Sequence, residues 1–136
     1  MTSALVGAFK VMHAVSAAQL APFGLHPGQD RLLAELWVQD GISQTELARR
    51  LGVEQPTVTK TLQRLERAGL VRRQRDPEDN RQVIVSLTVA GRAAHDPIQR
   101  LRDATERQMA EGFSAAERRQ FSELLDRVRR NLQQMR

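Results

Sequence analysis

The chain has 136 residues and a formal net charge of +5, from 21 Lys and Arg against 16 Asp and Glu; this suits one compact cytoplasmic domain, or a small domain with elements reserved for a partner. The absence of cysteine excludes disulfides, thiolate zinc sites and cysteine-based redox sensing. We find no run of about eighteen apolar residues and no basic-then-apolar N-terminus, so neither a membrane span nor a signal peptide is expected.

Two helices are predicted in the first forty residues. The first spans Thr2–Leu20, and its apolar residues recur at three- and four-residue spacing, as on one helix face: Leu5, Phe9, Met12 and Val15. Prolines and glycines then interrupt the chain. The second helix spans about Pro27–Gln39, because proline suits the first turn of a helix. It is expected to bury Leu32, Leu33, Leu36 and Trp37.

A helix-turn-helix pattern follows. Ser43-Gln44-Thr45-Glu46 is a capping box, in which the serine oxygen accepts a backbone hydrogen bond while the glutamate reaches back to the cap. It starts a short helix that ends at Leu51, and Gly52 permits a sharp turn. The next helix, about Gln55–Ala68, has apolar residues at i, i+4 and i+7, so one face is buried and the opposite face is polar.

Two strand-like runs, Leu70–Arg75 and Gln82–Leu87, are separated by a charged loop. Apolar and polar residues alternate in the second run, as in a half-covered strand, and the loop is too polar for a core. We therefore predict a hairpin with a protruding tip.

Positive charge is concentrated between Arg49 and Arg75, where eight basic residues face two acidic ones. This local excess of six is larger than the +5 of the whole chain, so the remainder is close to neutral. On a helix-turn-helix pattern, such focused charge indicates a polyanionic partner. Nineteen of the 21 basic residues are arginine, which suits phosphate and guanine contacts; a GC-rich genome is the alternative explanation.

The C-terminal part is predicted to be helical. Thr88 caps a long helix to about Gly112, and Pro97 inside it should cause a kink. Ser114-Ala115-Ala116-Glu117 is a second capping box that starts a final helix. The apolar residues of this helix fall on one side, and three of them are seven residues apart, which suits packing against another helix: Phe121, Leu124, Leu125, Val128, Leu132 and Met135.

Several of these segments resemble the multiple-antibiotic-resistance regulator (MarR) family of bacterial winged-helix transcription factors. Thr45–Val53 is similar to the family's first motif helix and turn, and Pro56–Lys60 with Leu65–Val71 to its recognition helix and exit. The most specific match is Asp79-Asn80-Arg81 followed, after five residues, by Leu87-Thr88-Val89-Ala90-Gly91. Gln29 also fits. The resemblance is strong over Leu25–Gly91 and architectural at both ends.

The resemblance implies a mainly α fold with a small β-hairpin wing. A winged helix-turn-helix lobe, residues 27–96, would bind DNA. Residues 1–26 and 97–136 would form the dimerisation helices. Such a protein would be a ligand-responsive homodimer, more often a repressor than an activator, that binds a pseudo-palindromic operator.

DNA contacts are expected from three places. The first turns of a helix in the major groove reach base edges, a helix N-terminus attracts a phosphate, and, by resemblance, Arg81 enters the minor groove with support from Asp79. Arg72, Arg73 and Arg75 would meet the DNA backbone. The expected contact residues are Ser43, Gln44, Thr45, Gln55, Pro56, Thr57, Thr59, Lys60, Arg64, Arg73, Arg75, Asp79 and Arg81. The alternatives are a solvated helix face and a surface ion pair of little consequence.

The terminal helices would hold a second copy. By resemblance, the dimer contacts are Leu5, Phe9, Met12, Phe121, Leu125, Val128 and Leu132, unless these helices only pack within one chain. Family members often bind small aromatic or anionic effectors between these helices and the DNA-binding lobe. The candidate lining residues here are Phe9, His13, Phe23, Arg31, Trp37 and Met109.

Other functions find less support. No phosphate-cradling glycine loop, nucleophile elbow or paired carboxylates indicate an enzyme, and the three histidines are too scattered for a metal site. We expect no cofactor. Two alternatives stay open: a winged helix that binds an acidic protein, and an architectural DNA-binding protein without an effector. Sequence patterns identify no operator, regulated gene or effector.

Overall fold

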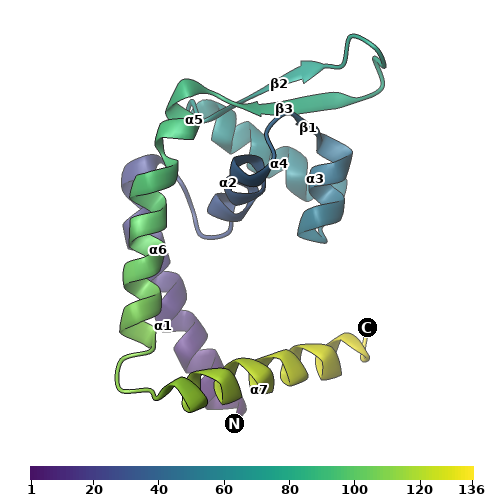
Figure 1. Cartoon of the computed structure of the whole chain (residues 1–136). Helices are drawn as coiled ribbons and strands as arrows, with labels where there is room; N and C mark the ends of the chain where they lie inside the picture. Colours follow the sequence, from purple (N-terminus) through teal and green to yellow (C-terminus); the bar gives the residue numbers. More distant parts are fainter. The chain divides into compact units, whose positions relative to one another are not determined.

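The computed structural model describes all 136 residues and divides them into two compact units, Met1–Gln99 and Arg100–Arg136. The fold is mainly helical with one small antiparallel sheet, as predicted (Figure 1). The elements in chain order are α1 (Thr2–Leu20), the 3-10 turn η1 (Ala21–Phe23), α2 (Gln29–Val38), β1 (Ile42–Ser43), α3 (Gln44–Leu51), α4 (Gln55–Arg67), β2 (Val71–Arg75), β3 (Val83–Leu87), α5 (Val89–Ala93), α6 (His95–Met109) and α7 (Ala115–Gln133).

The sheet has three strands in the order β1-β3-β2. The predicted hairpin is confirmed, with β2 and β3 paired from Val71 opposite Leu87 to Arg75 opposite Val83. The third strand, β1, was not predicted, because its two residues are too few to show an alternating pattern. It pairs with β3, and it therefore joins the start of the helix-turn-helix to the wing.

The core of the first unit lies between the sheet and helices α2, α3 and α4, which all lie on one side of the sheet (Figure 1). The helical spacing correctly identified its main side chains, although Trp37 is only half-buried. Burial of leucine side chains, each worth about 1.5–3 kcal/mol, holds the two motif helices at a fixed angle. The fully buried large residues are Leu32, Leu33, Leu36, Leu47, Val58, Leu62, Leu65, Val85 and Ile98.

The prediction of one kinked helix from Thr88 to Gly112 is wrong. The chain forms two helices, α5 and α6, which are separated at Ala94. Pro97 is the third residue of α6. It therefore lies in the first turn of α6, where its missing N–H is not needed.

Helix α1 corrects a second expectation. Together with η1 it forms a 22-residue helical segment, Thr2–Phe23, with a mean hydropathy of 1.3, which is long and apolar enough to cross a membrane by length and composition alone. Polar residues such as Lys10 and His13 interrupt the segment, but the exclusion of a membrane-spanning helix does not hold by length and composition. The same test is passed by signal sequences and by helices of soluble proteins, so it is weak evidence. Its large apolar residues are exposed: Leu5, Val6, Phe9, Val11, Met12 and Val15.

The second unit contains most of α6, a turn and α7. The predicted capping box at Ser114 is confirmed, because Ser114 Oγ accepts from the Glu117 N–H and Glu117 accepts from the Ser114 N–H. Phe113 packs edge-on against Phe121, with ring centroids 6.1 Å apart. Of the residues expected to contact a second copy, Phe121, Leu125 and Leu132 are exposed and Val128 is half-buried.

Candidate nucleic-acid interface

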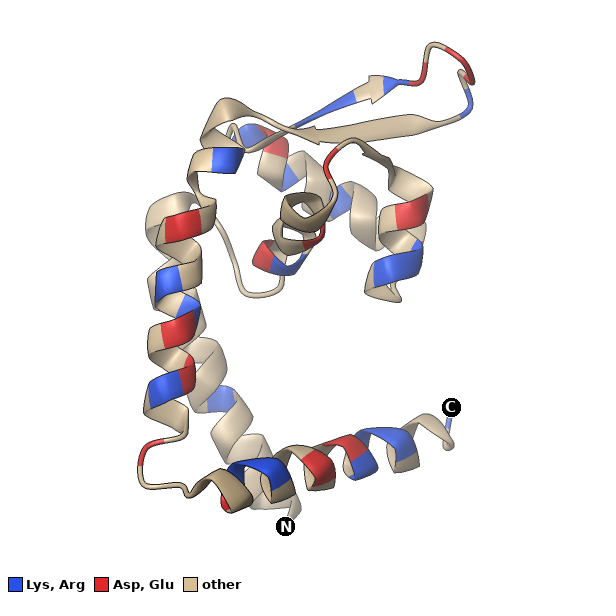
Figure 2. Ribbon diagram, in the orientation of Figure 1, with Lys and Arg blue, Asp and Glu red and all other residues tan.

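Helix α4 presents a polar and basic face to solvent. Pro56 lies in its first turn, and the apolar face is fixed in the core by Val58, Leu62 and Leu65. The opposite face therefore points outward, and Figure 2 shows basic residues along α4. Five of the predicted contact residues on this helix are exposed: Gln55, Pro56, Thr57, Lys60 and Arg64.

Thr59 is the exception, because it is half-buried at the junction of the two motif helices. Gln44 Nε2 donates a 2.7 Å hydrogen bond to Thr59 Oγ1. Gln44 is the first residue of α3 and Thr59 lies in the second turn of α4. Two residues that were predicted separately are thus one hydrogen-bonded pair.

The N-terminus of α3 lies next to α4 in the chain fold and is capped by Ser43, whose Oγ accepts from the Glu46 N–H at 3.1 Å. Thr45 is exposed. The other half of the predicted capping box is absent. Glu46 does not reach back; its carboxylate accepts from Arg49 at 2.6 and 2.8 Å and from Arg50 at 2.9 Å. Two guanidinium partners outcompete one backbone N–H because they are charged.

These two arginines hold the pKa of the Glu46 carboxyl at about 2, against an ordinary value of 4.5, chiefly through hydrogen bonds from Arg49 and then Arg50. A depressed acid pKa stabilises the folded state fully above about 4.5, and the stabilisation is lost as the pH falls through about 2. We expect the free energy of unfolding of the natural protein to fall more steeply over this range than that of Glu46→Gln in urea titrations. Glu123→Gln on α7 is the matched control, and parallel curves for Glu46→Gln would disprove the assignment.

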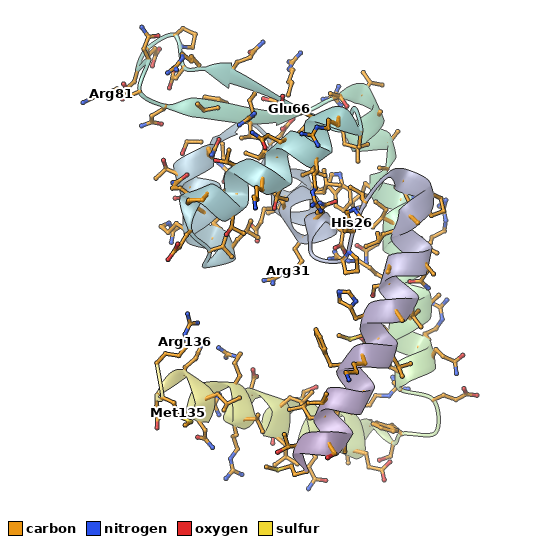
Figure 3. All side chains as sticks on the ribbon, turned by 180° about the vertical axis from the view of Figure 1, so that it is seen from behind. His26, Arg31, Glu66, Arg81, Met135 and Arg136 are labelled. Carbon is orange, nitrogen blue, oxygen red and sulfur yellow. The ribbon has the colours of Figure 1, made fainter.

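The wing tip is held in shape by short hydrogen bonds. Arg75 Nη1 donates to the Asn80 carbonyl at 2.7 Å, and the Arg81 N–H donates to Asp79 Oδ1 at 3.1 Å. Arg81 Nε lies 3.2 Å from the same carboxylate oxygen, while 91% of the Arg81 side chain is exposed. Figure 3 shows Arg81 projecting from the end of the wing. Asp79 thus orients a guanidinium that keeps most of its surface free.

Arg73 is placed differently from the other wing arginines. Its Nε forms an ion pair with Glu66 of α4, and both side chains are about two-thirds buried, with 26% and 35% exposed. Arg72 and Arg75 are exposed. Arg73 therefore joins the wing to α4, a role that its position in a basic run did not indicate.

The base of the wing contains a close approach of two backbone segments. Thr88 Oγ1 donates to the Gly69 carbonyl at 2.6 Å and accepts from the Gly91 N–H at 3.0 Å. The Gly91 carbonyl accepts from Trp37 Nε1 at 3.0 Å. A Cβ atom on Gly91 would overlap the carbonyl oxygen of Leu70. The spacing of Leu87, Thr88 and Gly91 thus fixes the wing to the lobe.

The six residues proposed to line an effector pocket lie in different surroundings. Phe9 contacts His13 on α1, Trp37 contacts His95, Phe23 packs on the core, and Met109 belongs to the second unit. Arg31 lines a cavity of about 350 Å³ between the start of α2 and the side of α4. His26 and Arg64 also line it, and sequence patterns gave no indication of that grouping. Figure 3 shows His26 and Arg31, both of which line this cavity, on the same side of the lobe.

Known proteins resemble this chain over most of its length. The model of the MarR family matches residues 25–83. The HTH-type transcriptional regulators YdgJ and YwoH of Bacillus subtilis (strain 168) are 35% and 36% identical over 109 and 106 residues, which are 80% and 78% of this chain and 66% and 77% of theirs. This chain thus spans slightly less than two thirds of YdgJ. The S. aureus MepR–DNA complex has a TM-score of 0.86 at 27% identity and covers 97% of this chain and 98% of its own.

Proposed function

Since this chain belongs to the MarR family, we propose that it is a cytoplasmic, homodimeric transcriptional repressor that binds a pseudo-palindromic DNA operator through residues 43–91 of each copy. The observation that carries this proposal is the common exposure of the outer face of α4 and of the Arg81 side chain on one basic lobe. A similar chain, S. aureus MepR, has been solved in complex with DNA.

In this proposal α4 is the recognition helix and lies in the major groove. Gln55, Thr57 and Lys60 are exposed in its first two turns, where side chains reach base edges. Arg64 lies about one turn further along and meets phosphate. The N-terminus of α3, with Ser43 and Thr45, binds a second phosphate through free backbone N–H groups.

The wing reads the adjacent minor groove. A narrow A·T-rich groove has an enhanced negative potential that favours an inserted guanidinium. Arg81 suits this role because the Asp79 carboxylate holds its Nε while most of the side chain stays exposed. Exposed Arg72 and Arg75 add phosphate contacts without sequence information.

A second copy covers the apolar residues of α1 and α7. One recognition helix reads only a few base pairs, so two helices set about 34 Å apart give the necessary specificity. Exposed side chains on both terminal helices, such as Leu5 and Phe9 on α1 and Phe121 and Leu132 on α7, are apolar surface that a partner would bury. Light scattering at micromolar concentration tests this directly, since a monomer would disprove the dimer.

A small anionic effector would bind in the cavity beside α4. The guanidinium groups of Arg31 and Arg64 supply positive charge, and Leu32, Leu51 and Val58 supply apolar walls. An occupant there would hold Arg64 away from phosphate and so weaken DNA binding. Benzoate is a suitable probe: it should release DNA from the natural protein and not from Arg31→Gln, and equal release from both would exclude this site.

Selection of bound duplexes from a random DNA pool tests the proposed function as a whole. A regulator should enrich a two-fold symmetric consensus. A winged helix that binds proteins would enrich nothing, and an architectural DNA-binding protein would bind many sequences with similar affinity. Either of these results would contradict the proposal.

Arg72→Ala should weaken binding to all duplexes alike and lower the slope of log affinity against log salt by about one, as one phosphate contact is lost. Lys60→Ala should instead change base preference at one position. Arg73→Ala should weaken binding indirectly, because it leaves the Glu66 carboxylate unpaired next to DNA. The double variant Arg73→Ala/Glu66→Gln should therefore recover part of the affinity in anisotropy titrations, and no recovery would show that Glu66 does not face the phosphates.

A further inference from the structure

We propose that Gln44 sets which DNA base Thr59 prefers. Because Gln44 donates to the Thr59 hydroxyl oxygen, the hydroxyl proton of Thr59 stays available to a base at the DNA surface. Gln44 is then a positioning residue for sequence recognition and not only a phosphate contact. The inference rests on the proposed function, because it requires that α4 faces base edges.

The geometry makes Thr59 the acceptor within the pair. Gln44 Nε2 donates to Thr59 Oγ1 at 2.7 Å, and both side chains are half-buried between α3 and α4. A hydroxyl has one proton and two acceptor positions. One acceptor position of Thr59 is therefore occupied by the amide, and its proton is still available.

Thr61 on the same helix is a threonine whose hydroxyl proton is not available to DNA. Its Oγ1 donates to the Thr57 carbonyl at 3.0 Å, so its proton is used within the helix. Thr59 forms no such bond with the carbonyl one turn earlier; its hydrogen-bond partner in the chain is Gln44. The two threonines have the same chemistry and lie two residues apart, and only Thr59 keeps a proton for DNA.

A free hydroxyl proton selects bases by their acceptors. In the major groove guanine offers N7 and O6, adenine N7 and thymine O4, whereas cytosine offers the N4 donor. Thr59 held by Gln44 should therefore disfavour cytosine at the base that it contacts. The discrimination from one neutral hydrogen bond is expected to be about three- to tenfold.

Reversing the direction of the hydrogen bond between residue 44 and Thr59 should reverse the base preference at the Thr59 position. In Gln44→Glu the introduced carboxylate can only accept, so Thr59 donates to that carboxylate and offers DNA an acceptor alone. Selection from a random duplex pool should then show a shift of about three- to tenfold towards cytosine, or towards the adenine N6 donor, at the Thr59 position alone. Gln44→Met keeps the side-chain length without the bond, so preference at this position should relax. Urea unfolding verifies that each variant is folded.

Two controls separate this mechanism from a charge effect. Thr45→Glu adds the same charge one residue further along α3 and should weaken all duplexes without changing base preference. In a Thr59→Val background, which removes the hydroxyl, Gln44→Glu should no longer move the preference. Such non-additivity is the signature of a direct pair.

The outcomes distinguish the two proposals. If the natural protein enriches no consensus, the proposed function fails. If it enriches a consensus that Gln44→Glu and Gln44→Met leave unchanged at every position, the role of Gln44 is disproved and the proposed function stands. A shift at the same position in Thr45→Glu, or a shift that persists with Thr59→Val, would also overturn the role of Gln44.

Discussion

Gly91→Ala should lower the free energy of unfolding by about 3 kcal/mol or more, the upper end of the cost of overpacking a close contact. The added Cβ would overlap the Leu70 carbonyl oxygen and would lie 3.0 Å from its carbon and 3.1 Å from Leu87 Cδ2. The neighbouring atoms cannot move cheaply. Leu70 O accepts from the Thr88 N–H, and the Gly91 carbonyl accepts from Trp37. Urea unfolding at neutral pH measures the loss.

Gly52→Ala is the matched control for this substitution. Gly52 has a φ of 65° and no atom within 4 Å of an added Cβ. Gly52→Ala should therefore lower the free energy of unfolding only through backbone strain, by about 1–2 kcal/mol. A Gly91 variant no less stable than the Gly52 variant would show that the wing is not fixed by this close approach.

Arg81→Ala should weaken binding to the selected operator by about ten- to a hundredfold, the effect expected when a groove contact is removed. The midpoint of unfolding should not change, because the side chain is 91% exposed and pairs only with Asp79. Anisotropy titration with labelled duplex gives the affinity. The loss should be larger for duplexes with an A·T-rich flank than for those with a G·C-rich flank, since the narrow groove is the source of the attraction.

Three further variants define the role of Arg81. Arg81→Lys keeps the charge without the planar fork and should recover only part of the affinity. Asp79→Asn removes the ionic anchor and should cause a smaller loss than Arg81→Ala. Arg119→Ala on α7, outside the proposed interface, should have no comparable effect. Equal losses of affinity for Arg81→Ala and Arg119→Ala would show that Arg81 affects DNA binding only through its contribution to the net charge.

Local patterns predicted most of the DNA-binding lobe. The capping serine before α3, the glycine turn and the i, i+4, i+7 spacing of Val58, Leu62 and Leu65 each depend on neighbouring residues, so the sequence displays them directly. The alternation in β3 is of the same kind. For this reason the boundaries of α3, α4 and the hairpin agree with the prediction to within one or two residues.

Features that depend on distant residues were missed. Strand β1 exists because Ile42 and Ser43 meet β3, more than forty positions later. Glu66 pairs with Arg73 and Gln44 with Thr59 only once α4 is packed against its neighbours. The pairing of Glu46 was missed for a different reason, since its partners Arg49 and Arg50 are local and lie one turn away. The motif also allows a bond to the cap, and the sequence does not show which partner the carboxylate takes.

Hydroxyl-radical footprinting of the selected operator locates the contacts of both recognition helices and both wings on DNA. Two recognition helices and two wings per dimer should protect two segments whose centres are about one helical turn apart, with a further protected minor-groove segment outside each. In Arg81→Ala the outer segments should become reactive while the inner pair stays protected. A single protected segment would show that the protein does not bind as a two-fold dimer, and a pattern that Arg81→Ala leaves unchanged would show that Arg81 does not enter the minor groove.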